Sequence, residues 1–189
     1  MLKKIYRFFY PPTTKTFWKY RRRILYPKGL QKYFKWWYSF RATRILEKMN
    51  ASIPITDRIR TFQTPHGLSG IFISAGARVG NGCTIFQQVT IGSNTMRGSK
   101  KCGAPVIGER VYIGAGAKII GGITVGNDVR IGANCIVTED IPANSTVVMD
   151  KPRIITYDTP RDNTFVEWDK YKASLKCSPF LLFKKLQRF

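Results

Sequence analysis

The sequence predicts a solenoid of short parallel β-strands flanked by two basic ends, and three observations indicate this fold class. Aliphatic residues recur at every sixth position through the middle of the chain. Glycine directly follows most of them. The net charge of +21 is concentrated at the ends, because residues 1–50 carry 14 basic side chains and one acidic one, whereas residues 51–150 carry nine and six. We therefore expect a basic, aromatic N-terminal segment over residues 1–50, a repeat domain over 51–155 and a tail over 156–189.

The six-residue period matches neither the 3.6-residue repeat of a helix nor the two-residue alternation of one long strand. A short flat strand followed by a tight corner fits it, and three such sides give a triangular coil of 18 residues. We expect glycine to supply the corner conformation, which residues with a Cβ avoid. A β-sandwich with coincidental spacing is the alternative. The predicted inward-facing residues are Ile73, Val79, Ile85, Ile91, Ile107, Ile113, Ile119, Val125, Ile131 and Val137.

The stretches VGNGCTIFQQVTIGS and VIGERVYIGAGAKIIGGITVGNDVRIGANCIVTEDIPANS resemble the hexapeptide-repeat acyltransferases over roughly residues 52–155. The resemblance implies a left-handed parallel β-helix, acetyl-CoA as the acetyl donor and a homotrimer. With the preceding TPHGLSGIFISAGAR, the chain looks like the serine-acetyltransferase branch, and particularly its sugar and capsule O-acetyltransferase relatives.

His66 is the only histidine of the chain, which excludes zinc sites built from several imidazoles, and we expect no metal. The resemblance implies that His66 is the general base, since the family has a histidine where PHGLSGIFI stands here. An imidazole near neutral pH can take the proton of an attacking hydroxyl. A purely structural histidine is the alternative.

The motif departs from the serine enzymes on the acceptor side. Pro65 stands where they have an Asp, Ala104 stands near their second His, and the Asp that orients the base aligns near Ser52, with Asp57 as a possible substitute. An uncharged sugar hydroxyl does not need those charges. The resulting hypothesis is O-acetylation of a saccharide, a precursor of a surface or capsular polysaccharide. Serine O-acetylation is one alternative, and a non-catalytic, membrane-associated scaffold is another.

On the donor side, the resemblance implies that Ser93, Ala115 and Ala133 contact the pantetheine arm and that Arg130 lies near the CoA phosphates. The spacing breaks once, between Ile91 and Ile107, which lie 16 residues apart, four more than two repeats. The extra material, SNTMRGSKKCGAP, predicts an extruded basic loop that either meets an anionic ligand or forms a solvated charge cluster.

Residues 1–50 hold 14 of the 25 aromatic residues, interleaved with Lys and Arg. This composition favours an anionic membrane surface over nucleic acid, for which no recognition motif is present, and packing of a basic helix on the solenoid is the alternative. Residues 30–48 contain no Pro or Gly and predict a helix, and the C-terminal SPFLLFKKLQRF predicts a second, short amphipathic one. No transmembrane run or signal peptide is expected, and four dispersed cysteines do not indicate a disulfide scaffold. We expect a cytoplasmic protein, peripheral at the inner face of the plasma membrane.

Overall fold

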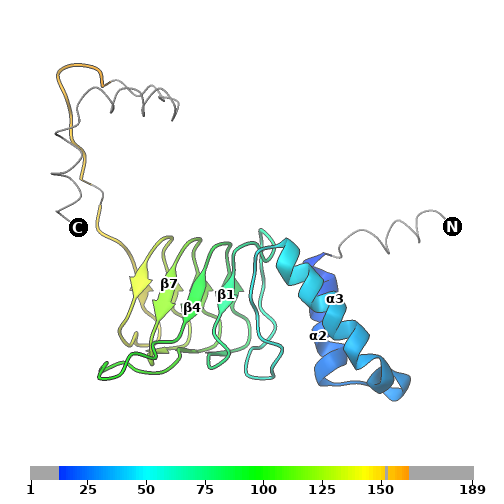
Figure 1. The fold of residues 1–189 in the computed structure, drawn as a ribbon. Coiled ribbons are helices and arrows are strands. Elements are labelled where there is room, and N and C mark those ends of the chain that lie inside the picture. Colours follow the sequence, from blue (N-terminus) through cyan, green and yellow to red (C-terminus); the bar gives the residue numbers. More distant parts are fainter. Residues whose placement is uncertain (1–12, 152, 162–189) are drawn as a thin grey trace, which may run out of the picture. The chain divides into compact units, whose positions relative to one another are not determined.

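The structure is a computed structural model that describes residues 13–151 and 153–161. The chain divides into two compact units, residues 1–150 and 151–189. The first unit consists of a helical hairpin followed by a β-helix (Figure 1). In the second unit, residues 151 and 153–161 contain no helix or strand, and the expected C-terminal helix lies outside the described residues.

The β-helix has three flat sheets in which every strand pair is parallel, and successive strands move from one sheet to the next. Sheet A contains β1, β4, β7 and β10, sheet B contains β2, β5 and β8, and sheet C contains β3, β6, β9 and β11. The fold is the left-handed parallel β-helix that the motifs predicted. The strands are β1 Phe72–Ile73, β2 Arg78–Val79, β3 Thr84–Ile85, β4 Thr90–Gly92, β5 Val106–Ile107, β6 Tyr112–Ile113, β7 Lys118–Ile120, β8 Thr124–Val125, β9 Arg130–Ile131, β10 Ile136–Val137 and β11 Thr146–Val147.

The core of the β-helix is the stack of aliphatic side chains that the six-residue period predicted. All ten are buried, and each lies above its counterpart in the next coil, as Ile85, Ile113 and Ile131 do in sheet C. Burial of an Ile or Val side chain contributes about 1.5–3 kcal/mol, so this column accounts for much of the stability of the domain. Each coil buries its aliphatic face against its neighbours.

The glycines that follow the aliphatic residues serve a different purpose from the predicted one. None of them has a positive φ, the conformation that is unfavourable for residues with a Cβ. Positive φ values occur instead at other corner residues, such as Gly116 and Asn134. Instead, they allow adjacent coils to approach closely. A Cβ on Gly80 would lie 2.4 Å from the carbonyl oxygen of Gly108, and one on Gly114 would lie 2.6 Å from the next coil's backbone.

The break in the repeat is a larger insertion than the spacing predicted. β4 leads directly into β5, so the 16 residues from Ile91 to Ile107 replace a single six-residue step, and ten residues are extra rather than four. The count from sequence was wrong because it assumed an intervening strand. The insertion leaves the coil at the edge between sheets A and B.

The helical hairpin consists of α2 (Thr14–Leu25), η1 (Gly29–Phe34) and α3 (Lys35–Lys48). One face of α2 packs against the first turn of the β-helix, where Trp18 meets Phe62 edge to face at 4.9 Å. Arg21 is buried and donates hydrogen bonds to two carbonyl oxygens of residues 56–59, and this burial lowers the pKa of its guanidinium. The alternative prediction, that a basic helix packs on the solenoid, is therefore correct for one face of α2.

No helix within the described residues has the length and apolar character needed to cross a bilayer.

Candidate active site

His66 lies on the edge of the prism where sheet C passes into sheet A. Backbone hydrogen bonds join the coils along this edge: Gln88 N–H donates to Ser69 O at 3.0 Å, Gly116 N–H to Gln87 O at 3.0 Å, and Asn134 N–H to Ala115 O at 2.8 Å. The turn that carries His66 is therefore followed, coil by coil, by the corners at residues 86–88, 115–116 and 133–134. We call this line of corners the catalytic edge.

The imidazole of His66 is exposed and is held by one hydrogen bond and one ring contact. Its Nδ1 lies 2.9 Å from Oε1 of Gln87. Its ring meets that of Phe86 edge to face, with centroids 5.4 Å apart and an interplanar angle of 87°. Since an amide oxygen only accepts, Nδ1 carries the proton of the neutral ring and Nε2 keeps its lone pair. Within the described residues Nε2 has no hydrogen-bond partner. This tautomer is the one that a general base needs.

The local chain explains why the ring stays in place. Gly67 N–H closes a turn onto Thr64 O at 3.1 Å, and Gly67 itself has a φ of +80°, which suits glycine. A Cβ on Gly67 would lie 3.7 Å from Oγ1 of Thr14, the first residue of α2, so the turn rests against the start of that helix. The turn that carries His66 therefore lies beside the start of α2, while the ring itself contacts Phe86 and Gln87.

Gln87 is the hydrogen-bond partner of His66 that the sequence did not predict. The candidates were Ser52 and Asp57, but Ser52 pairs with Phe72 in sheet A, and the Asp57 carboxylate accepts a hydrogen bond from the neighbouring Thr56 hydroxyl. Neither is a partner of His66. The sequence did contain one signal for Gln87. Phe86 and Gln87 occupy a corner of the coil that follows His66, and the equivalent corners of later coils hold small residues.

A strip of rings connects His66 to Arg130 along the outer surface of sheet C. Phe86 contacts Tyr112 with ring centroids 5.1 Å apart, and the guanidinium of Arg130 lies 6.0 Å from the Tyr112 centroid. Three of the residues expected to contact acetyl-CoA therefore lie on the same side of the prism as His66: Ala115 and Ala133 on the catalytic edge, and Arg130 at the end of the ring strip.

Ser93 lies on another edge. It follows β4, where sheet A passes into sheet B, and its hydroxyl accepts a hydrogen bond from Ser74 Oγ at 3.2 Å. Within one chain, Ser93 therefore does not form a continuous surface with His66. A shared site needs the two edges to come from different copies of the chain.

The inserted loop also leaves the prism at the edge that carries Ser93. Asn94 and Gly103 exchange two backbone hydrogen bonds of 2.8 Å at its base. Nζ of Lys101 lies 2.5 Å from Oδ2 of Asp140, whose other oxygen accepts the Thr124 N–H at 2.7 Å. The Lys101 ammonium, and then the Thr124 N–H, hold the pKa of the Asp140 carboxyl below its usual range. These contacts hold the two ends of the inserted loop against the β-helix.

The loop's remaining cations, Arg97 and Lys100, are exposed, and neither has an ion-pair partner among the described residues. The two readings of this cluster, an anion contact or a solvated charge group, both remain compatible with that position.

Two other features of the described residues lie apart from His66 or lack the groups for a metal centre. The described residues contain no group of three or more His, Cys, Asp or Glu side chains placed to hold a metal ion. A cavity of about 500 Å³ lies between α2 and the first coil, lined by basic side chains, Asp57 and Asn81, but by neither His66 nor the expected donor residues.

Known proteins share sequence similarity with the repeat region. Residues 104–139 match the family described as bacterial transferase hexapeptide (six repeats). The chain is 39% identical over 100 residues to a serine acetyltransferase of Mycobacterium tuberculosis, covering 53% of this chain and 43% of that protein. It is 43% identical over 93 residues to a serine acetyltransferase of Helicobacter pylori, covering 49% and 53%. The chain thus spans about half the length of these relatives.

Solved structures give the same result. The serine acetyltransferase isoform 3 of Entamoeba histolytica, crystallised with cysteine, superposes with a TM-score of 0.54 at 32% identity, covering 74% of this chain and 46% of that one. The Neisseria gonorrhoeae serine acetyltransferase, crystallised with serine, gives 0.54 at 28% identity, covering 72% and 54%. The repeat region is therefore similar to bacterial hexapeptide transferases and to serine acetyltransferases, and these comparisons do not show the sugar and capsule branch that the motifs favoured.

Proposed function

We propose that the protein is an acetyl-CoA-dependent O-acetyltransferase that uses His66 as general base and L-serine as acceptor. One observation carries the proposal: Gln87 fixes the only imidazole of the chain in the tautomer that leaves Nε2 free, on the edge that also carries Ala115 and Ala133.

The proton balance of the reaction is simple. Nε2 of His66 takes the hydroxyl proton as the acceptor oxygen forms a bond to the acetyl carbon. Nδ1 keeps its hydrogen bond to Gln87, which holds the ring while it is transiently cationic. When the carbon–sulfur bond breaks, the proton passes from Nε2 to the departing sulfur, and the products are the acetate ester and free CoA. In this proposal the oxyanion is stabilised by backbone N–H groups of the corners that do not bond a neighbouring coil.

Serine is the first acceptor because both curated relatives and both solved structures described above are serine acetyltransferases. A saccharide hydroxyl is the second candidate, and one observation favours it. Pro65 precedes the base, and Ala104 stands in the loop where the serine enzymes have a second imidazole, so no charged side chain lies beside His66 in the sequence or at that loop position.

We further propose that the active form is a homotrimer. His66 and Ser93 lie on different edges of one prism, and a threefold arrangement brings the catalytic edge of one chain to the loop-bearing edge of the next. The exposed Arg97 and Lys100 then become available to the anionic phosphates of the donor. In this arrangement Arg130 and Ser93 contact the same acetyl-CoA from two subunits.

The test is a panel assay in which CoA release is followed with a thiol reagent and the acetylated product is identified by mass spectrometry. L-serine, D-serine and a set of neutral and anionic sugars serve as acceptors. An acetate ester of L-serine as the main product supports the first candidate. Acetylated sugar with no serine product supports the second, and acceptor-independent loss of acetyl-CoA overturns both.

A further inference from the structure

The end of the helical hairpin exposes an unusual number of large apolar side chains. We call this surface the aromatic tip and define it by five residues of η1 and α3. Leu30 is 74% exposed, Tyr33 71% and Trp36 76%. The complete set is Leu30, Tyr33, Phe34, Trp36 and Phe40, each more than half exposed. Isolated apolar residues on a surface are ordinary, but five within eleven positions form a patch that marks an interaction site.

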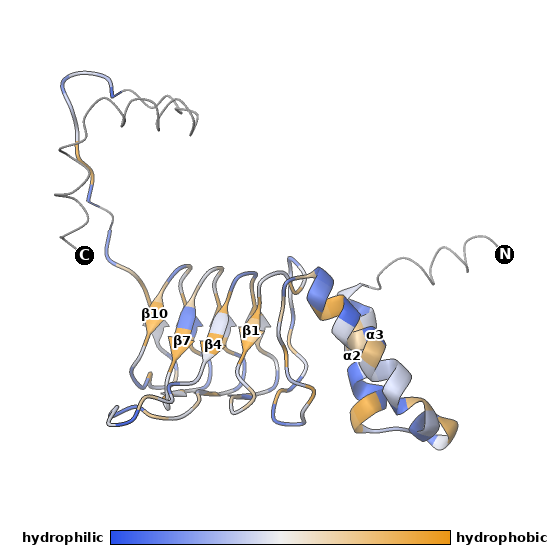
Figure 2. Cartoon of the chain, viewed as in Figure 1, coloured by the Kyte–Doolittle hydropathy of each residue, from blue (hydrophilic) through white to orange (hydrophobic). Residues whose placement is uncertain are grey.

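The helix geometry places two of these side chains, Trp36 and Phe40, on one exposed face of α3. Trp36 and Phe40 are four residues apart on α3, and their rings stack at an interplanar angle of 16° with centroids 6.1 Å apart. The opposite face of α3 carries Tyr38, Ala42 and Ile45, which are buried. The hairpin therefore has one apolar face inside the protein and exposes further large apolar side chains to solvent. In Figure 2 its helices carry both hydrophobic and hydrophilic segments.

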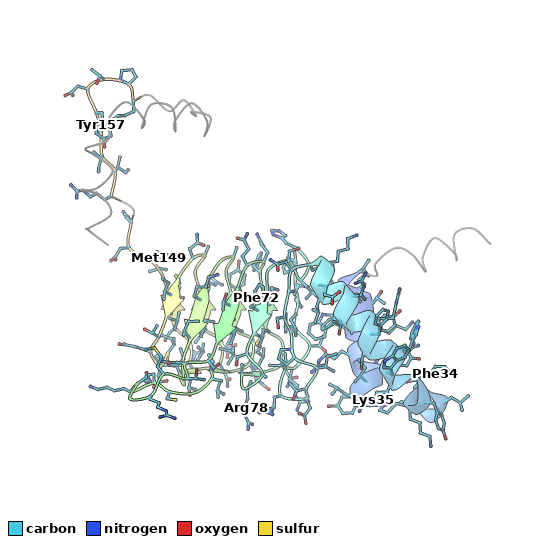
Figure 3. The ribbon with its side chains drawn as sticks, viewed as in Figure 1. Phe34, Lys35, Phe72, Arg78, Met149 and Tyr157 are labelled. Atoms are coloured by element: carbon cyan, nitrogen blue, oxygen red, sulfur yellow. The ribbon has the colours of Figure 1, made fainter. Side chains whose placement is uncertain are left out.

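Cations surround the aromatic tip. Lys28, Lys32 and Lys35 are exposed beside it, and Nζ of Lys32 lies 4.9 Å from the centroid of Tyr33. Figure 3 shows Phe34 and Lys35 together at the end of the hairpin. Residues 13–46 contain no acidic side chain. The positive charge complements an anionic lipid leaflet. Binding to a protein partner through a complementary apolar surface would not need it.

We propose that the aromatic tip docks onto the surface of an anionic phospholipid bilayer. The rings enter the headgroup region and the three lysines contact lipid phosphates, so the hairpin anchors the β-helix without spanning the membrane. The catalytic residues lie on the β-helix, outside the tip. This inference is independent of the acceptor proposed above, since it concerns a surface that the acetyl transfer does not use.

The first test distinguishes the effect of the three lysines at the aromatic tip on vesicle binding from the effect of the protein's total charge. Each Lys near an anionic leaflet strengthens binding by roughly fivefold, so Lys28→Gln, Lys32→Gln and Lys35→Gln together weaken it about 100-fold. The control carries Lys151→Gln, Arg153→Gln and Arg161→Gln, which remove the same charge from exposed positions elsewhere. Both are measured by co-sedimentation with phosphatidylserine-containing and pure phosphatidylcholine vesicles at low and high salt. Equal binding by the two triple variants would overturn the proposal.

The second test reports insertion of one ring. Vesicles with brominated acyl chains quench the fluorescence of an inserted tryptophan, and Trp36 is the most exposed of the described tryptophans. We expect Trp36→Phe to lose most of the quenching while its vesicle binding falls less than tenfold. Unchanged quenching would overturn the proposal. Because the ring is exposed, the variant should melt as the wild type does.

A second copy of the chain is the competing occupant. Light scattering of a Leu30→Ser, Trp36→Ser, Phe40→Ser variant distinguishes it. Loss of vesicle binding with an unchanged oligomeric mass is the expected result. A smaller mass with unchanged vesicle binding would overturn the proposal and identify the aromatic tip as a contact between chains.

Discussion

Substitution of Gln87 tests the geometry of the catalytic edge without removing the base. The side chain of Gln87 makes one neutral hydrogen bond of 2.9 Å to His66, while its backbone carbonyl accepts the Gly116 N–H and is unaffected by substitution. Such a bond has a net value of about 0.5–1.5 kcal/mol. At about 1.4 kcal/mol per factor of ten, Gln87→Ala should lower kcat by roughly two- to thirteenfold and leave the KM for acetyl-CoA nearly unchanged.

The pH profile separates a positioning role from a structural one. Gln87→Glu keeps an acceptor oxygen but places a negative charge beside the ring, which favours the imidazolium. Exposed ion pairs contribute about 0.2–1 kcal/mol, so the acid limb of the kcat profile should move up by at most about 0.7 pH units. Gln63→Ala, a change of the same side-chain type on a neighbouring exposed position, is the control. Wild-type kcat and an unshifted profile in both Gln87 variants would refute the reasoning.

Three further outcomes follow from the fold and the site. Gly114→Ala should destabilise the protein by about 1–3 kcal/mol, since its Cβ would meet backbone of the next coil at 2.6 Å, and an unchanged melting temperature would contradict the close-packing account. Asp140→Asn should melt below the wild type at pH 7, and the difference should shrink below about pH 4. The reason is that the pKa of this carboxyl is lowered in the folded state, so its contribution is present above the unfolded value and lost as the pH falls through the folded one. A constant difference between pH 7 and pH 3 would be inconsistent with the Lys101 pair. Light scattering should give the mass of three chains, and a fully active monomer would refute the shared site.

The sequence predicted the fold because the aliphatic column repeats in strict register, and every one of its ten positions is buried. It did not predict why glycine follows these positions. Close approach of the next coil's backbone excludes a Cβ, whereas a positive φ only disfavours one. Only the structure shows that Gly114 is crowded by that backbone, while Gly116 has a φ of +73° and faces the Asn134 side chain. The loop length was misjudged for a similar reason, since the six-residue period does not state which sheet a strand joins.

The site was predictable only in part. His66 stood out as the single histidine beside the first repeat, but its partner Gln87 lies 21 residues further along the chain and becomes a neighbour only through the stacking of coils. Alignment with the family's orienting Asp therefore pointed to Ser52, with Asp57 as a possible substitute, instead of Gln87. The residues expected to contact acetyl-CoA divide between two edges. Positions that look equivalent in the repeat lie at different corners of the prism. The packing of α2 and the exposure of η1 also depend on tertiary contacts that composition does not specify.

Chemical rescue of a His66→Ala variant tests the central claim most directly. The imidazole of His66 is solvent-exposed, so free imidazole should reach the space that the substitution leaves. CoA release with the acceptor identified in the panel should fall about 10²–10⁴-fold in the variant and then rise in proportion to the concentration of neutral imidazole. Ser69→Ala, on the same edge, should behave as the wild type and should not respond to imidazole. A His66→Ala enzyme that turns over at the wild-type rate without added imidazole would contradict the account.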